Sequence, residues 1–250
     1  MTAAARFAPS SIDSAKIEQI EVDAGKSAIR VNIRNTGELP ITAFSILFYQ
    51  VKSSGERVPC GGRGADMIDW SDPMPRSNVY IHMRRNWIEP HASQWFEGYP
   101  RYRGETVPLD NIRAELSFIM FDDGGGEGDP ARINFILLTR QQARDERVKW
   151  MARFAALHHT SALKSSSQQL YQDLVDAAHE AEINPERASQ QGSAKPVRNE
   201  LQGLALDITQ WASRGDDLTK NEVLDWRVTD LEQRTVRLIQ GAGKMDASPL

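Results

Sequence analysis

Phe121-Asp-Asp-Gly-Gly-Gly-Glu-Gly-Asp-Pro130 is the stretch on which the fold assignment depends. It holds four carboxylates and four glycines, and it lies between residues 112–121 and 131–138, both of which have the composition of strands. Glycines permit positive φ in tight turns, and the carboxylates of such a turn remain in water. The sequence therefore predicts a hairpin in which 112–121 pairs with 131–138.

The same loop has an alternative interpretation as a calcium site. Ca²⁺ takes six to eight oxygen ligands, and carboxylates together with backbone carbonyls could supply several of them. The order of residues does not match an EF-hand loop, which needs Asp, Asp/Asn and Gly at fixed positions and a Glu at position 12. Calcium therefore stays the alternative to a plain hairpin, and it is the only cofactor the sequence suggests. Its ligands would be Asp122, Asp123, Glu127 and Asp129.

Composition limits the class of protein. Of the 250 residues, 40% are hydrophobic and 26% charged, which is typical of a globular chain with one large or two ordinary domains. The net charge is −4 and the pI about 5.8, so nothing favours binding to nucleic acid or to an anionic membrane. No apolar run approaches the roughly 20 residues that a membrane-spanning helix needs.

The compartment stays open. Residues 1–11 lack the apolar central region of a signal peptide, and we expect them to be disordered. The protein is then cytoplasmic, or it is periplasmic or extracellular if a signal was removed. Cys60, the single cysteine, excludes an intramolecular disulfide and lies in what reads as a loop.

The first half of the chain has the pattern of β-structure. Residues 27–34 alternate between apolar and polar, and 41–51 are apolar and aromatic enough for a central strand. Short strands separated by turn residues predict an antiparallel, Ig-like β-sandwich over residues 12–138. The predicted strands are 16–23, 27–34, 41–51, 78–83, 92–98, 112–121 and 131–138.

After residue 138 the apolar period becomes helical. Three capping boxes, beginning at Thr139, Ser165 and Thr219, precede stripes of apolar residues spaced by three and four. The sequence predicts an α-helical hairpin or bundle over 139–240, a flexible connection at 184–195 and a disordered tail at 241–250. The predicted helices are 139–159, 165–183, 196–213 and 219–240.

The apolar stripes of these helices are narrow, like the seam of a coiled coil. Each stripe must be buried against another helix, the sandwich or a partner chain. We therefore expect the helices to bind a protein partner or to form an oligomer.

An aromatic and arginine-rich region, 80–103, is the second candidate site. Trp, Tyr and Arg are enriched in binding hot spots, and aromatic faces also stack on sugar rings. The alternative is that some of these aromatics face the core and the arginines are ordinary surface charges. The candidate binding residues are Arg84, Arg85, Trp87, Trp95, Tyr99, Arg101 and Tyr102.

No stretch of the sequence carries a catalytic signature. The phosphate loop, the dinucleotide-binding glycines, the zinc-binding helix motif and the nucleophile elbow are all missing from it. We therefore expect a protein that is not an enzyme.

Two short motifs resemble a group of uncharacterised, usually exported bacterial β-sandwich proteins. They are Asn35-Thr-Gly-Glu-Leu-Pro-Ile-Thr-Ala-Phe44 and Phe121-Asp-Asp-Gly-Gly-Gly-Glu-Gly-Asp129, with the aromatic segment near Trp95 between them. Such proteins carry an Asn-Thr-x-x-x-x-Ile-Thr-Ala strand and a Phe-x-Asp-Gly-x-x-x-Gly-Asp hairpin followed by helices. The resemblance covers roughly residues 16–160 and implies a fold and a tendency to export, but no activity.

Together these observations predict a non-enzymatic protein-interaction or scaffold module of unknown partner. The alternative is a β-sandwich that binds carbohydrate or another small ligand through its aromatic region, supported by calcium.

Overall fold

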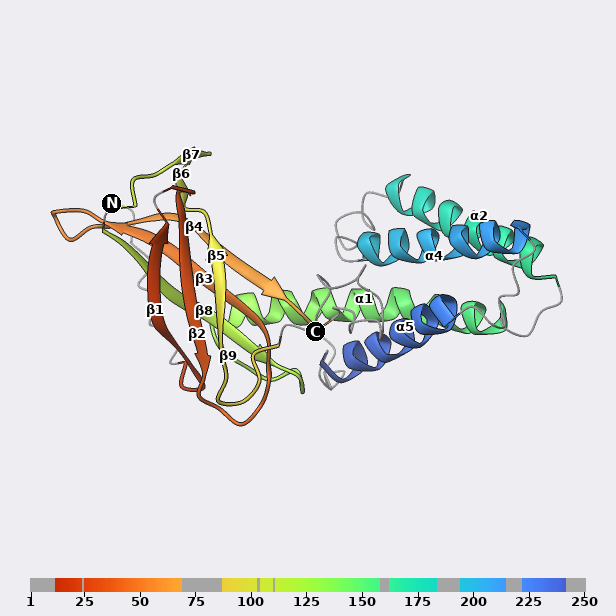
Figure 1. The fold of residues 1–250 in the computed structure, drawn as a ribbon, viewed down its shortest axis with the longest axis horizontal. Coiled ribbons are helices and arrows are strands. Elements are labelled where there is room, and N and C mark those ends of the chain that lie inside the picture. The colour runs from red at the N-terminus through yellow and green to blue at the C-terminus, as the bar shows by residue number, and fades with distance from the viewer. Residues whose placement is uncertain are drawn as a thin grey trace. The chain divides into compact units, whose positions relative to one another are not determined.

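A computed structural model gives the fold of the chain (Figure 1). It describes residues 12–23, 25–68, 87–102, 104–109, 111–157, 162–183, 194–214 and 222–241. Backbone proximity divides the chain into two units. The described residues 12–68 and 87–136 form the β unit, and those from 137 to 241 form the helical unit.

The β unit contains two antiparallel sheets and a two-stranded ribbon. The three-stranded sheet has the order β1-β2-β5, the four-stranded sheet β4-β3-β8-β9, and the ribbon joins β6 to β7. In Figure 1 the three-stranded sheet lies across the four-stranded one. The strands are β1 (Ala15–Asp23), β2 (Ala28–Asn35), β3 (Ile41–Val51), β4 (Arg57–Asp66), β5 (Ser93–Gly98), β6 (Arg101–Tyr102), β7 (Glu105–Thr106), β8 (Ile112–Phe121) and β9 (Gly126–Gly128).

Alternation along the strands builds the core of the β unit. Ile29, Val31 and Ile33 point to one face of β2 and are fully buried, as the period of two in the sequence predicts. Phe44 of β3 and Phe96 of β5 join the two sheets, with ring centroids 4.2 Å apart. Burying each such side chain contributes about 1.5–3 kcal/mol, so this apolar face holds the unit together.

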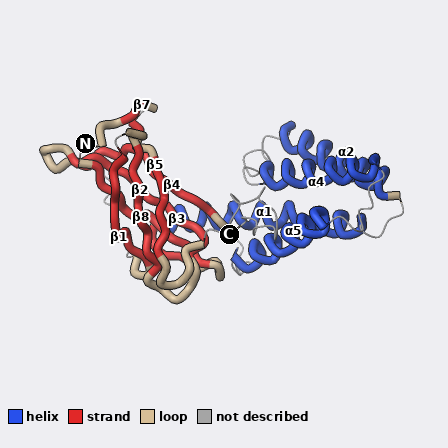
Figure 2. Tube along the Cα trace, viewed as in Figure 1, coloured by secondary structure: helices blue, strands red, loops and turns tan. Residues whose placement is uncertain are grey.

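The four described helices are α1 (Pro130–Leu157), α2 (Leu163–Ile183), α4 (Ala194–Arg214) and α5 (Glu222–Gly241). Figure 2 shows the helices in blue and the strands in red. Most of the seam residues predicted from the apolar spacing are buried, whereas Ala178 and Trp211 of the same stripes are half-buried. The buried seam residues include Trp150, Phe154, Leu157, Leu170, Leu174, Val197, Leu201, Leu204, Ile208, Val228, Leu231, Thr235 and Leu238.

The predicted strand at 131–138 is wrong, because these residues form the first two turns of α1. Asp129 explains the error: its carboxylate accepts a hydrogen bond from the amide of Ala131 at 3.0 Å, as an N-cap does. Pro130 then occupies the first helical position, where its missing N–H costs nothing. The true partner of β8 at this end is β9, which the loop itself supplies.

A strand was also missed at Arg57–Asp66, around Cys60, where the sequence reads as a loop. Gly62 is required there because a Cβ would lie 2.5 Å from the carbonyl oxygen of Ile46 on the neighbouring strand. Cys60 is buried, and this burial raises the pKa of its thiol.

Several predictions fall on other parts of the chain. The strand at 78–83, the disordered segment 1–11, Arg84 and Arg85 lie outside the described residues, as do 184–193 and 242–250. No helix in the described part of the chain is long and apolar enough to cross a membrane.

Candidate interaction surface

One side of the β unit is incompletely covered. Strand β9 pairs only with Phe118–Met120 of β8, so the edge of β8 from residue 112 to 117 carries no neighbouring strand in the described structure. Strand β1 is an edge strand of the three-stranded sheet, and it lies close to β8 of the four-stranded sheet. We call this region, β8 residues 112–117 with the facing side chains of β1, the open edge.

Apolar side chains of β1 are exposed at the open edge. Ile20 pairs with Val31 and Val22 pairs with Ile29, so both point to the apolar face of the three-stranded sheet. Their partners on β2 are fully buried, whereas Ile20 is 39% and Val22 54% exposed. The difference arises because β2 is covered by the opposite sheet and the end of β1 is not.

β8 contributes the matching face. Leu116 pairs with Ile46 and Ala114 pairs with Phe48, and both partners on β3 are buried. Leu116 and Ala114 themselves are only half-buried. The open edge is therefore lined on both sides by apolar side chains that point toward the space between the sheets.

The backbone of β8 also points its polar groups to the open edge. The carbonyl of Ser117 accepts a hydrogen bond from the amide of Asp129 at 2.8 Å, so this residue faces the edge that β9 covers. The amide of Val51 on β3 donates to the carbonyl of Asn111 at 3.1 Å, and Arg113 and Glu115, two and four residues further on, therefore also direct their backbone groups to β3. The pairing of β8 with β3 shifts at Ser117, so the backbone groups of Ala114 and Leu116 face the open edge together with Ser117. From Leu116 back to Ile112, that edge has no strand partner among the described residues.

Two charged side chains of β8 lie on the outer face of its sheet. Glu115 receives a hydrogen bond from Arg57, which raises the pKa of that guanidinium, and Arg57 also lies 3.6 Å from the ring centre of Tyr49. Arg113 is exposed and donates only to the neighbouring carbonyl of Ile112, at 3.2 Å. Within the described residues, no carboxylate pairs with Arg113.

The acidic loop next to the open edge is built into the fold. The Glu127 carboxylate accepts hydrogen bonds from the amides of Asp13 and Ser14 at 2.7 and 2.9 Å, and from the Ser14 hydroxyl at 2.5 Å. Burial alone would raise the pKa of Glu127, but these three hydrogen bonds outweigh it and hold the pKa below its usual value. Glu127 therefore fastens the start of β1 to the loop.

The other carboxylates of the loop have local roles. Asp123 accepts a hydrogen bond from the amide of Gly125 at 2.8 Å, and Asp129 caps α1 while lying 3.4 Å from Arg132. Asp122 is half-buried. In the described part of the chain, no three acidic, His or Cys side chains are grouped as metal ligands would be. The calcium interpretation stays a prediction.

The predicted aromatic and arginine residues differ in how deeply the structure buries them. Trp87 is a core residue, and its indole N–H donates to the carbonyl of Met67 at 3.0 Å. Trp95 is half-buried, and the guanidinium of Arg30 lies 4.8 Å from its ring centre.

The other described members of that set, Tyr99, Arg101 and Tyr102, are exposed. The hydroxyl of Tyr99 donates to Glu97, which raises the pKa of the phenol. Arg101 and Tyr102 form β6 of the two-stranded ribbon. Their exposure does not by itself group these residues into one binding site.

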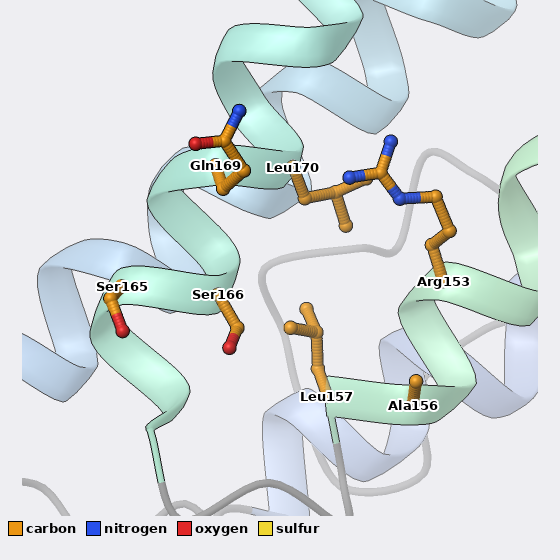
Figure 3. Close-up of a pocket in the computed structure, with 7 residues that line it drawn as sticks. All are labelled: Arg153, Ala156, Leu157, Ser165, Ser166, Gln169 and Leu170. Carbon is orange, nitrogen blue, oxygen red and sulfur yellow. The ribbon is translucent and has the colours of Figure 1, made fainter.

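The helical unit contains an open pocket of about 480 Å³ (Figure 3). Arg153 at its rim is bound to Asp173, whose pKa this hydrogen bond lowers. The pocket therefore carries a neutralised ion pair beside apolar and hydroxyl groups rather than an acid–base pair. Its lining residues are Arg153, Ala156, Leu157, Ser165, Ser166, Gln169 and Leu170.

Buried arginines link the helices of the helical unit. Arg147 of α1 is fully buried and lies 3.2 Å from Glu200 of α4, while Arg234 of α5 binds both Glu200 and, at 2.8 Å, Asp230. We call these four residues the polar layer. Burial would raise the pKa of Glu200, but Arg234 and then Arg147 lower it, so the carboxylate stays ionised.

Comparisons with known proteins assign no family. No family model matches the sequence, and no curated protein matches it. A 1.85 Å X-ray structure of a hypothetical protein from Peptoclostridium difficile 630 matches 50% of this chain and 91% of its own, with 11% identity and a TM-score of 0.27. A similarity at that score supports no conclusion about fold or function.

The open edge was not found from sequence. Strand β1 was predicted, and its alternation placed Ile20 and Val22 on an apolar face, but alternation does not tell whether another strand covers that face. The uncovered length of β8 depends on how far β9 extends, and β9 itself was missed.

Proposed function

We propose that the chain is a non-enzymatic protein-interaction module that binds its partner at the open edge of an Ig-like β-sandwich. The observation that supports this most directly is the exposure of Ile20 and Val22 on the apolar face of β1. Contiguous apolar surface bordered by polar groups is typical of protein-binding sites. The unpaired edge of β8 adds backbone hydrogen-bonding groups to that surface.

The helical unit is the second surface of this proposal. Val236 and Ile239 lie three residues apart on α5 and are each about half exposed, although most seam residues of α5 are buried. An exposed apolar pair of this kind suits self-association or the docking of a partner helix. Sedimentation over a concentration series tests the oligomer, which a monomer at every concentration would contradict.

Site-specific crosslinking tests the proposed function. A photoreactive amino acid at position 22 would capture the partner in cells of the source organism, and the same group at position 236 would report on the helical surface. We expect the capture from position 22 to be lost when Ile20→Glu is added, because a charge in the open edge must be desolvated on binding. The proposal would be contradicted if crosslinking from position 22 were unchanged by Ile20→Glu. It would also be contradicted if position 22 crosslinked to no specific partner.

A carbohydrate- or small-ligand-binding β-sandwich, supported by calcium, is the alternative. The stacking of Arg30 on Trp95 favours it, because an aromatic ring beside a fixed cation and exposed polar groups can contact a sugar. Glycan-array binding that is lost in Trp95→Ala but kept in Leu206→Ala, an exposed site of the helical unit, would favour this alternative. The resemblance noted from sequence adds export to the proposal, without assigning a compartment.

A further inference from the structure

The open edge has a shape and chemistry that select one kind of occupant. It combines a row of backbone groups on β8 with apolar side chains on the inner side and one exposed cation on the outer side. An extended strand is the element that meets all three, because its backbone can pair with β8 and its side chains alternate between the two faces.

The inner positions of such a strand would be apolar. Side chains at every second residue would lie beside Leu116 and Ala114 of β8 and would cover Ile20 and Val22 of β1. These four residues are half-buried or exposed, although the residues they pair with are buried. Burial of apolar surface at this site supplies the driving force for binding.

The outer positions of the strand would meet the charged groups of β8. Glu115 is already bound by Arg57, whereas no carboxylate in the described structure pairs with Arg113. Opposite charges that face each other across neighbouring strands stabilise the pair. A carboxylate beside Arg113 is therefore the complementary residue.

We propose that the partner supplies an extended segment that adds to β8 at residues 112–117, with apolar residues at alternate positions and an Asp or Glu beside Arg113. This inference rests on the proposed function and specifies its partner. A second copy of the chain fits less well. The carboxylates of its own exposed strand, Glu21 and Asp23, are already close to Arg30 and Lys26.

A displayed library of random ten-residue peptides, selected on the full chain, tests the proposal. We expect the selected peptides to alternate apolar residues with polar ones and to contain an acidic residue. Their binding should slow the exchange of the Ala114 and Leu116 amides, which face the open edge. Methylation of alternate peptide nitrogens should abolish binding for one set of positions and spare the other, because only one set faces β8.

Variants of the chain sharpen the test. Arg113→Glu should weaken the acidic peptides by up to about fivefold and restore binding to peptides in which Lys replaces the acidic residue. Val22→Asp should weaken all of them by tenfold or more, because the charge must be desolvated. Val148→Asp, at a half-exposed site of α1, is the matched control and should leave binding unchanged.

Each other outcome has a definite meaning. Peptides that bind without protecting the Ala114 and Leu116 amides would overturn the strand-addition inference but not the proposed function. No selected peptide, with capture from position 22 still specific, would overturn it in the same way. Protection of these amides by the protein's own dimerisation would show that a second copy is the occupant. Failure of both selection and capture would overturn the inference and the function together.

Discussion

The cores of the two units differ in the interactions that stabilise them. The core of the β unit is apolar, and residues such as Ile33, Phe44 and Phe48 are almost completely buried. The core of the helical unit also contains arginines: Arg140 and Arg147 of α1 are 1% and 0% exposed. Arg147 lies in the polar layer, and Arg140 donates to the carbonyl of Gly241, the last residue of α5, at 3.0 Å.

This contrast sets how each unit responds to change. An apolar core is stable over a wide range of pH and fails when its packing is disturbed. Buried ion pairs depend on both partners remaining charged, and removing one partner leaves the other charge desolvated. The β unit should therefore be sensitive to changes of volume, and the helical unit to changes of charge.

The largest expected effect is in the β unit. Phe44→Ala removes a buried ring that packs on Phe96, and it should lower the free energy of unfolding of the β unit by about 3–5 kcal/mol. Hydrogen exchange resolved by segment would show faster opening of β2, β3 and β8. Equal acceleration in α4 would contradict an effect confined to the β unit.

Val22→Ala is the matched control in the same unit. Because this side chain is more than half exposed, its truncation should cost well under about 1 kcal/mol. A cost close to that of Phe44→Ala would show that Val22 is buried in the free protein. That result would contradict the open edge as a binding surface.

Glu200→Gln is the corresponding change in the helical unit. It removes the carboxylate that Arg147 and Arg234 share, and a fully buried pair broken in this way costs about 3–5 kcal/mol. Glu200 is 36% exposed, so water screens part of the effect and about 2–3 kcal/mol is expected. Urea unfolding followed by circular dichroism at 222 nm measures the loss.

Acid should have the same effect on the wild-type chain. The pKa of Glu200 is lowered in the folded state, so its contribution is complete above the ordinary carboxyl pKa and is lost as the pH falls through the lower, folded value. Glu200→Gln should remove this part of the acid dependence. Glu232→Gln, at an exposed site of α5, should leave it unchanged. An acid profile that Glu200→Gln does not alter would disprove the role of the polar layer.

Substitution of one glycine in each unit should change stability by smaller amounts and in opposite directions. A Cβ on Gly98 would overlap the ring of Phe48, so Gly98→Ala should destabilise the β unit by about 1–2 kcal/mol. Gly203 in α4 has open space around it, and Gly203→Ala should stabilise the helical unit by about 0.5–1 kcal/mol. Thermal melting with segment-resolved exchange would check the opposite signs.

Local pattern predicted much of this fold. The strand at 27–34 can be recognised without knowledge of its neighbours because it alternates strictly, and the seam residues of the helices follow the period of an α-helix. Val31 and Leu201 are buried where those periods place them. The arginines of the polar layer escaped this reasoning, because a charged residue in a seam looks like a surface residue until its partners are known.

The errors lie where local patterns conflict. Residues 131–138 are apolar enough for a strand, and the Asp129-Pro130 pair that begins the helix was the available signal against it. The run is apolar without being fully buried: Phe135 is 67% and Leu138 52% exposed. At Arg57–Asp66 the glycines suggested a loop, but they permit close approach of β4 to β3.

The smallest expected effect concerns the acidic loop, and it separates the hairpin from the calcium site. Glu127→Gln should cost the β unit about 0.5–1 kcal/mol, because the amides of Asp13 and Ser14 lose a charged acceptor. The lowered pKa of Glu127 means that the wild-type chain loses the same contribution in acid, and the variant should not.

Millimolar calcium should leave the melting temperature of both proteins unchanged. Ligand binding to the folded state would raise it, but Glu127, Asp123 and Asp129 already accept hydrogen bonds from the backbone, and calcium would have to displace them. A rise in the wild-type melting temperature that Glu127→Gln removes would establish the metal site instead. It would also place a charge-sensitive element in the unit that otherwise depends on apolar packing.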